Sequence, residues 1–123
     1  MPYALYKLIH FLGIFTTVTV LAALAMHALR GGTRADIPHR RLLGAVHGFA
    51  VFLILLGGFG MLARLGAMHG QLPGWVFAKL LIWLLFAAAI AVPLRLRRFA
   101  GFLLVLVPLL AVLGGAIALY KPF

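Results

Sequence analysis

The sequence predicts an all-α protein: a four-helix, up-and-down bundle that spans a membrane. Of the 123 residues, 66% are hydrophobic and the mean hydropathy is +1.20, which is far outside the balance of a soluble domain. Four apolar runs, each long enough to cross roughly 30 Å of hydrocarbon, are separated by short loops. Because short connections join antiparallel neighbours, we expect residues 1–123 to form one integral membrane domain.

Each apolar run is expected to be one transmembrane helix, because about 20 residues rising 1.5 Å each are needed to span the bilayer. The four expected helices cover residues 3–29, 42–65, 75–94 and 99–120. Gly31-Gly32 and Ile37-Pro38 end the first helix, and Leu72-Pro73-Gly74 predicts a turn before the third. Pro108 lies inside the fourth helix and predicts a kink there.

The basic residues predict how the bundle lies in the membrane. The chain carries eleven Lys and Arg and one acid, a net charge of +10 that would suggest nucleic acid in a soluble protein. Here the charges sit at the ends of apolar runs, so we expect the lipid bilayer as partner and no nucleic acid. Seven arginines lie in the first and third loops: Arg30, Arg34, Arg40, Arg41, Arg95, Arg97 and Arg98. Arginine-rich short loops stay in the cytoplasm, so both termini are expected on the outer side.

Lys79 lies well inside the third expected helix. It follows Trp75 by four residues and precedes Trp83 by four, so all three share one helix face. A charge inside hydrocarbon is costly unless it is paired, hydrated or able to reach the interface. The only acid of the chain, Asp36, is expected on the opposite side of the membrane. Lys79 therefore either reaches outward to lipid phosphates or binds an acidic group.

His10 is the second candidate for a binding residue. It follows Lys7 by three positions, on nearly the same helix face, and its expected depth is similar to that of Lys79. Lys7, His10 and Lys79 together could hold a carboxylate, a phosphate or the propionates of a tetrapyrrole by charge-assisted hydrogen bonds. The alternative is that His10 bonds the backbone of a neighbouring helix, a common use of polar side chains in membrane bundles.

Two further histidines form a second candidate site near the cytoplasmic side. His27 and His47 lie near helix ends, at depths that differ by about one turn. Two neutral imidazoles on adjacent helices can ligate a b-type haem or a divalent metal. His10 and His47 are the alternative pair of metal ligands. His39 and His69 fall in loops and are expected to be solvated.

Glycines predict how closely the helices pack, and residue types that the chain lacks exclude several kinds of chemistry. Gly44 and Gly48 form a Gly-x-x-x-Gly pair, which predicts close packing of helices. Further small positions of the same kind are Gly57, Gly58, Gly60, Gly114 and Gly115. Without cysteine the chain has no disulfide, thiolate metal site or thiol nucleophile. It also has no phosphate-binding glycine loop, no paired carboxylates and no serine nucleophile. We therefore expect no catalytic residues and no hydrolase chemistry.

Short motifs in the same order along nearly the whole chain carry a family resemblance. They are Lys7-Leu8-Ile9-His10, His47 with Leu53-Ile54-Leu55-Leu56-Gly57, the Trp-x-x-Ala-Lys pattern of residues 75–79, and Ala118-Leu119-Tyr120-Lys121-Pro122. Together they resemble the SirB-like group of small bacterial inner-membrane proteins. The resemblance implies four helices in a bacterial inner (cytoplasmic) membrane, and we expect a non-catalytic, multi-pass protein of this type. The outer side on which the arginine counts place both termini would then be the periplasm. The resemblance also implies a small subunit or partner of a larger membrane assembly.

A more distant resemblance concerns two residues. His10 on the first helix and Lys79 on the third match positions in HemJ-type protoporphyrinogen oxidases and CopD-like proteins. The HemJ pattern has a histidine two residues before that lysine, where this chain has Phe77. This resemblance implies an alternative function, a membrane redox protein that binds haem b or a porphyrin. A second alternative is the handling of copper or another metal.

Overall fold

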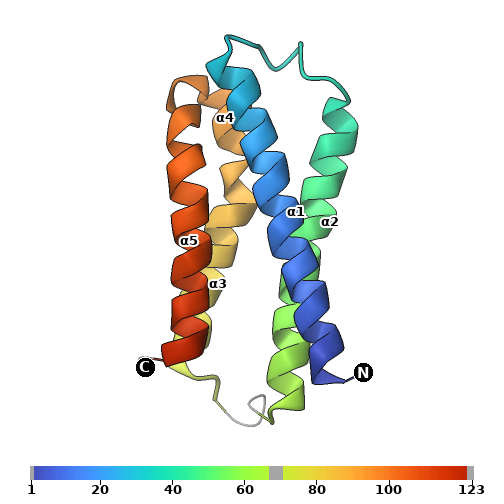
Figure 1. The fold of residues 1–123 in the computed structure, drawn as a ribbon, viewed down its shortest axis with the longest axis vertical. Coiled ribbons are helices and arrows are strands. Elements are labelled where there is room, and N and C mark those ends of the chain that lie inside the picture. The colour runs from blue at the N-terminus through green and yellow to red at the C-terminus, as the bar shows by residue number, and fades with distance from the viewer. Residues whose placement is uncertain (1, 67–70, 122–123) are drawn as a thin grey trace.

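The computed structural model describes residues 2–66 and 71–121, and its regular structure there is entirely helical. The elements are α1 (Tyr3–Leu29), α2 (Arg40–Arg64), α3 (Gly74–Ala89), α4 (Ala91–Arg95), the 3₁₀ turn η1 (Arg97–Phe99) and α5 (Ala100–Tyr120). They form four apolar spans, because α3 continues into α4 and η1 into α5. Figure 1 shows these spans running up and down the long axis. The predicted all-α, four-helix bundle is confirmed.

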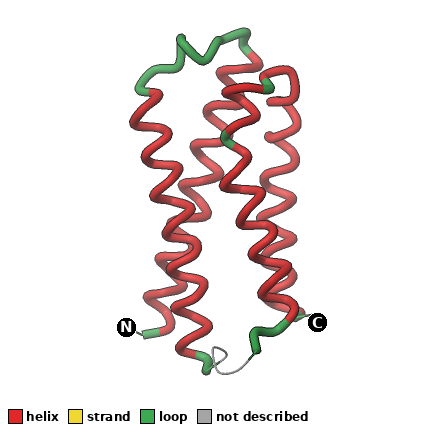
Figure 2. The backbone as a smooth tube through the Cα atoms, turned by 180° about the vertical axis from the view of Figure 1, so that it is seen from behind, coloured by secondary structure: helices red, strands yellow, loops and turns green. Residues whose placement is uncertain are grey.

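The two ends of the bundle differ in what they carry. Both chain ends lie at one end, together with the start of α3, and we call this the terminal end (Figure 1). The opposite end carries the loop between α1 and α2 and the connection from α4 to α5, as Figure 2 shows from behind. All seven arginines of these two connections lie there. We call it the arginine end.

Helix α1 is followed by a glycine in the left-handed conformation. Gly31 has a φ of +82°, and its N–H donates to the carbonyl of Ala28 at 3.0 Å. The N–H of Gly32 donates to the carbonyl of His27, also at 3.0 Å. This pair of bonds is the Schellman motif, in which a left-handed residue after the helix satisfies its last carbonyls. The chain leaves α1 at this point and continues into the loop that leads to α2.

The third span is not the single helix that the sequence predicts over 75–94. It consists of α3 and α4, which meet at Ile90. The reason is Pro93, whose ring lacks an N–H and collides with the carbonyl four residues earlier. That residue is Ala89, where α3 ends. Neighbouring helices cover the break, since Pro93 is buried.

Helix α1 is the centre of the bundle. It packs along α2 and also contacts α4 and α5, while α3 packs on α5 and α2. Leu21 and Ala25 of α1 are fully buried against Phe86 of α3 and Leu103 of α5. Because α1 is covered on several sides, its inward positions set the geometry of the whole bundle.

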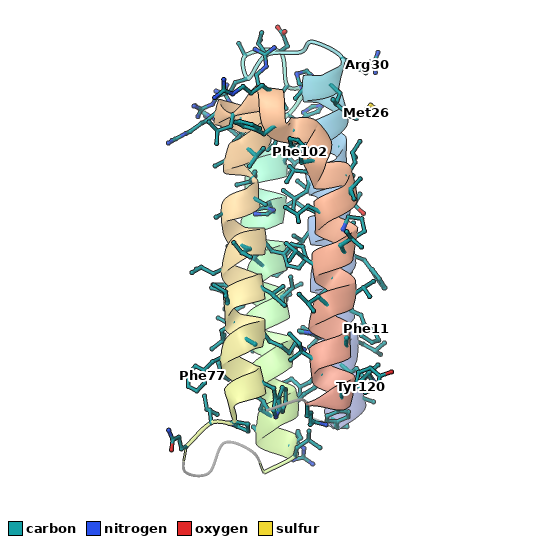
Figure 3. All side chains as sticks on the ribbon, turned by 90° about the vertical axis from the view of Figure 1, so that its left-hand side faces the viewer. Phe11, Met26, Arg30, Phe77, Phe102 and Tyr120 are labelled. Atoms are coloured by element: carbon teal, nitrogen blue, oxygen red, sulfur yellow. The ribbon has the colours of Figure 1, made fainter. Side chains whose placement is uncertain are left out.

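Large apolar side chains cover the outside of the bundle. Phe15 and Phe102 are each 67% exposed and Leu119 is 81% exposed. Figure 3 shows Phe11, Phe77 and Phe102 on the outer surface. An apolar surface of this extent needs a hydrocarbon environment. Together with the four long apolar helices, it identifies a multi-pass membrane protein.

The close approach of α1 and α2 depends on glycines other than the predicted pair. A Cβ at Gly13 would lie 2.6 Å from the carbonyl oxygen of Ala50, and one at Gly57 would lie 2.6 Å from the backbone nitrogen of His10. By contrast, the space beside Gly44 and Gly48 is open. The prediction that Gly44 and Gly48 form the close contact is wrong, because their side of α2 does not face another helix of the chain.

Candidate functional site

His10 is fixed on α1 by a hydrogen bond to α2. The ring is 7% exposed, and its Nδ1 lies 2.7 Å from the carbonyl oxygen of Ile54. Since a carbonyl oxygen can only accept, Nδ1 carries the proton. In a neutral ring this leaves a lone pair on Nε2, which is free to accept a hydrogen bond or to ligate a metal. Gly57 and Gly58 provide the room, because a Cβ at Gly58 would already touch the ring at 3.6 Å.

Lys79 approaches His10 from another helix. It is partly buried, on the second turn of α3, and its charge lies within electrostatic range of the His10 ring. The two residues lie about 8 Å and about 11 Å from the starts of α3 and α1, both at the terminal end. Within residues 2–66 and 71–121, Lys79 forms no hydrogen bond and no ion pair. His10 and Lys79 therefore lie at similar distances from the terminal end, on two different helices.

The only carboxylate side chain cannot neutralise Lys79. Asp36 lies in the loop at the arginine end, opposite the start of α3 (Figure 1). Its Oδ2 accepts a hydrogen bond from the backbone N–H of Thr33 at 3.1 Å. This bond, and a second one from Thr33, hold the pKa of Asp36 below its ordinary value of 3.8. Asp36 thus organises a loop, at the far end from the site.

Lys7 does not join His10 and Lys79 in one set. Its side chain is exposed, and its Nζ lies 5.9 Å from the centre of the Phe11 ring, one turn along α1. Figure 3 shows Phe11 on the outside of the bundle. A cation over an aromatic face at this distance is a modest, surface interaction. The structure therefore separates Lys7, on the lipid-facing side, from the two inner residues.

His27 and His47 are not brought together as a pair of ligands. His27 Nε2 lies 2.9 Å from the carbonyl oxygen of Thr33, so its ring closes the end of α1 against the loop. His47 Nε2 lies 3.3 Å from the carbonyl oxygen of Ala87, so this ring is turned toward α3. In each ring Nε2 already donates to a carbonyl oxygen. The described residues give no support for a haem held between them.

His10 and His47 are also at different levels. His10 contacts α2 from Ile54 onward, seven residues beyond His47. Seven helical residues correspond to about 10 Å, which is too far for both rings to bind one ion. Among the residues that the structure describes, no group of three or more His, Cys, Asp or Glu is placed to hold a metal. A metal bound by both histidines therefore does not fit this arrangement.

Sequence reasoning missed two polar features of the interior. Trp83 Nε1 donates to the carbonyl oxygen of Val51 at 2.8 Å, which ties α3 to α2. Thr17 Oγ1 and His47 Nδ1 are buried without a partner in the described part of the chain. The signal for Trp83 was available, since an indole N–H inside a bilayer must find an acceptor. Thr17 could have been found from its spacing, because residues 10, 13 and 17 share one face of α1.

Comparisons of the chain with protein-family models, with curated proteins and with solved structures found no match. Function must therefore be argued from the chemistry of His10 and Lys79. An ammonium group can bind an anion, and a ring nitrogen with a lone pair can accept a hydrogen bond from a donor.

Proposed function

We propose that this chain is a non-catalytic integral membrane protein that binds an acidic, membrane-soluble ligand at His10 and Lys79. One observation carries the proposal: Lys79 is partly buried within a span, and no carboxylate among the described residues pairs with it. A lysine in hydrocarbon loses hydration that it regains only from a polar or anionic partner. A ligand carboxylate or phosphate would supply that partner.

His10 supports the same kind of ligand. Its Nδ1–H is used by Ile54, so in a neutral ring Nε2 accepts from a protonated or hydroxyl-bearing ligand group. An ammonium and an acceptor at similar depths on two helices suit a ligand that carries both an acidic group and a donor. The ligand should have an apolar body, because both residues lie within spans of high hydropathy.

The wider assignment follows the sequence motifs. We place the chain with the SirB-like proteins of the bacterial inner membrane, as a small subunit or partner of a larger assembly. In that setting, the ligand is either a lipid or an acidic cofactor that a neighbouring subunit shares. The support for this assignment is the order of the motifs along the chain, and the helical bundle is compatible with it.

The test measures how tightly detergent-solubilised protein binds a long-chain fluorescent fatty acid and its methyl ester. The acid should bind about tenfold more tightly than the ester, because a charge-assisted hydrogen bond contributes about 1.5–3 kcal/mol. Lys79→Met should remove this preference and leave ester binding unchanged. Lys7→Met is the matched control, since Lys7 lies on the outer surface, and it should keep the preference. Equal binding of acid and ester to the unmodified protein would contradict the proposal.

A haem or porphyrin is the second candidate ligand, favoured by the geometry of His10. A ligating histidine commonly donates its other ring N–H to a carbonyl, which fixes the ring and its tautomer, and His10 makes this bond. Lys79 would then bind a propionate. Haem added to the purified protein should give a Soret band that moves on reduction, and His10→Ala should abolish it while His47→Ala keeps it. No visible absorption after haem is supplied would exclude this candidate.

A further inference from the structure

A cationic hollow lies at the arginine end, far from His10 and Lys79. It has a volume of about 590 Å³ and is lined by Ala35, Ile37, His39, Arg40, Arg41 and Leu42. Arg40 is held in place, because its Nη1 donates to the carbonyl oxygen of Arg34 at 3.2 Å. Arg41 is exposed and makes no hydrogen bond within the described residues. The hollow therefore presents one fixed and one free guanidinium.

An apolar groove follows on the same helix. It has a volume of about 280 Å³ and runs between Leu12 and Thr16 of α1 and the stretch of α2 from Ala45 to Leu53. Along α2 the residues change from Arg40 and Arg41 to Ala45, Val46 and Phe49 within about two turns. This groove faces outward, since Leu12 and Phe49 are 58% and 63% exposed.

The two hollows are aligned. Leu42 lines the first, and Ala45 and Val46 line the second. Residues three and four apart lie on one helix face, and three residues correspond to about 5 Å. A molecule that lies along this face therefore meets guanidinium groups first and an apolar channel directly beneath them, which is the order of groups along a phospholipid.

The local charge selects an anionic headgroup. Seven arginines lie at this end, and the only acidic side chain of the chain, Asp36, is hydrogen-bonded to Thr33. The first turn of α2 contains no acidic residue. Guanidinium groups bind phosphate oxygens in a two-pronged geometry, and basic residues next to a span attract anionic lipids.

From these observations we propose that one anionic phospholipid binds along the arginine end of α2. Its phosphate lies beside Arg40 and Arg41, and one acyl chain lies in the groove between α1 and α2. The site is separate from that of the proposed function, so either can hold without the other.

Native mass spectrometry of the detergent-solubilised protein, titrated with phosphatidylglycerol or phosphatidylcholine, tests this site. Phosphatidylglycerol should bind preferentially. Arg41→Gln should weaken its binding about fivefold, the effect of one basic residue near a lipid surface. Arg95→Gln is the matched control, because Arg95 is exposed at the same end but does not line the hollow, and it should bind like the unmodified protein.

A separate substitution tests whether an acyl chain lies in the groove. Ala45→Phe fills the groove and should reduce phosphatidylglycerol binding, whereas Ala88→Phe, at an exposed position of α3, should not. Ala45→Leu replaces Ala45→Phe if the larger side chain prevents folding, as judged by circular dichroism. If Arg41→Gln and Arg95→Gln weakened phosphatidylglycerol binding equally, the effect would be one of overall charge, and the proposal would be overturned. Unchanged binding in the Ala45 variant would also overturn it.

Discussion

Three polar side chains inside the bundle bond backbone carbonyls of a neighbouring helix, whereas Thr17 Oγ1 is buried without a partner in the described part of the chain. His10 donates to Ile54, Trp83 to Val51 and His47 to Ala87. Because no water reaches hydrocarbon, each donor needs a protein acceptor, and such bonds contribute about 0.6 kcal/mol on average in membranes. Lys79 also has no such acceptor in the described residues, and unlike Thr17 it carries a charge, which is the basis of the proposed ligand site.

At the residue scale, Asp36 predicts a pH effect on its loop. Bonds from Thr33 keep the folded-state pKa of Asp36 below its ordinary value of 3.8. A carboxyl with a depressed pKa stabilises the folded loop fully above pH 3.8, and this stabilisation is lost as the pH falls through the lower folded value. The amide proton of Thr33, followed by NMR in micelles, should therefore titrate with a midpoint below 3.8.

Two comparisons control the Asp36 measurement. Asp36→Asn should abolish the titration of the Thr33 amide. The amide of Gly31, which bonds the carbonyl of Ala28, should not titrate in either protein. A midpoint at or above 3.8 would show that the bonds from Thr33 do not stabilise the charged carboxylate.

At the element scale, α1 and α2 form the tightest pair because glycines let their backbones meet. Gly13 lies against Ala50 and Ile54, and Gly57 lies against Tyr6 and His10. Gly60 makes a comparable approach to the Tyr6 ring. Close backbone contact through small residues is the usual basis of helix association where lipid removes the hydrophobic driving force. This contact also positions His10 toward Ile54.

Alanine substitutions at glycines on the two faces of α2 should have different effects on stability. Gly57→Ala should destabilise the protein by about 1–3 kcal/mol, because the new Cβ would lie 2.6–2.7 Å from backbone atoms of α1. Gly48→Ala is the matched control on the open face, and it should leave stability unchanged or raise it by up to about 1 kcal/mol. Thermal unfolding in detergent measures both. Similar melting temperatures for the two variants would contradict the packing described for α1 and α2.

At the scale of the whole molecule, charge and aromatic residues divide the bundle along its long axis. The arginine end carries seven of the eleven basic residues. Tyr3, Trp75 and Tyr120 lie at the terminal end, each within the first or last turn of its helix. Lys121 Nζ lies 5.6 Å from the centre of the Trp75 ring, which joins the end of α5 to the start of α3. Arginines on one side and interfacial aromatics on the other predict one orientation in the bilayer.

This orientation can be measured directly. Reporters attached at the C-terminus and inserted at Gln71 should both report the outer side, because the terminal end has fewer basic residues. A reporter inserted at Ala35, in the loop between α1 and α2, should report the cytoplasm. A cytoplasmic signal at Gln71 with an outer signal at the C-terminus would contradict the four-span arrangement. Opposite signals from all three reporters would show that the bundle has the opposite orientation in the membrane.

The number, length and connectivity of the helices were predictable because they depend on local composition. Twenty apolar residues in a row have few alternatives to a spanning helix, and α1 begins and ends as predicted, at Tyr3 and Leu29. The break at Ile90 was less accessible, although Pro93 contained the signal. Which histidines would meet could not be read from depth alone, because rotation of each helix about its axis decides which way a ring points.

The sequence by itself determined the four spans, the charge difference between the ends and the isolation of Lys79 from Asp36, since each follows from composition and order along the chain. Only the tertiary structure decided that His10 turns to Ile54, that Lys7 lies outside, and that His27 and His47 bond separate carbonyls. It also showed that the close helix contact lies at Gly13 and at Gly57, one of the further small positions of the sequence, and not at Gly44 and Gly48. The physical reason is that helix rotation is set by the combined packing of all four spans.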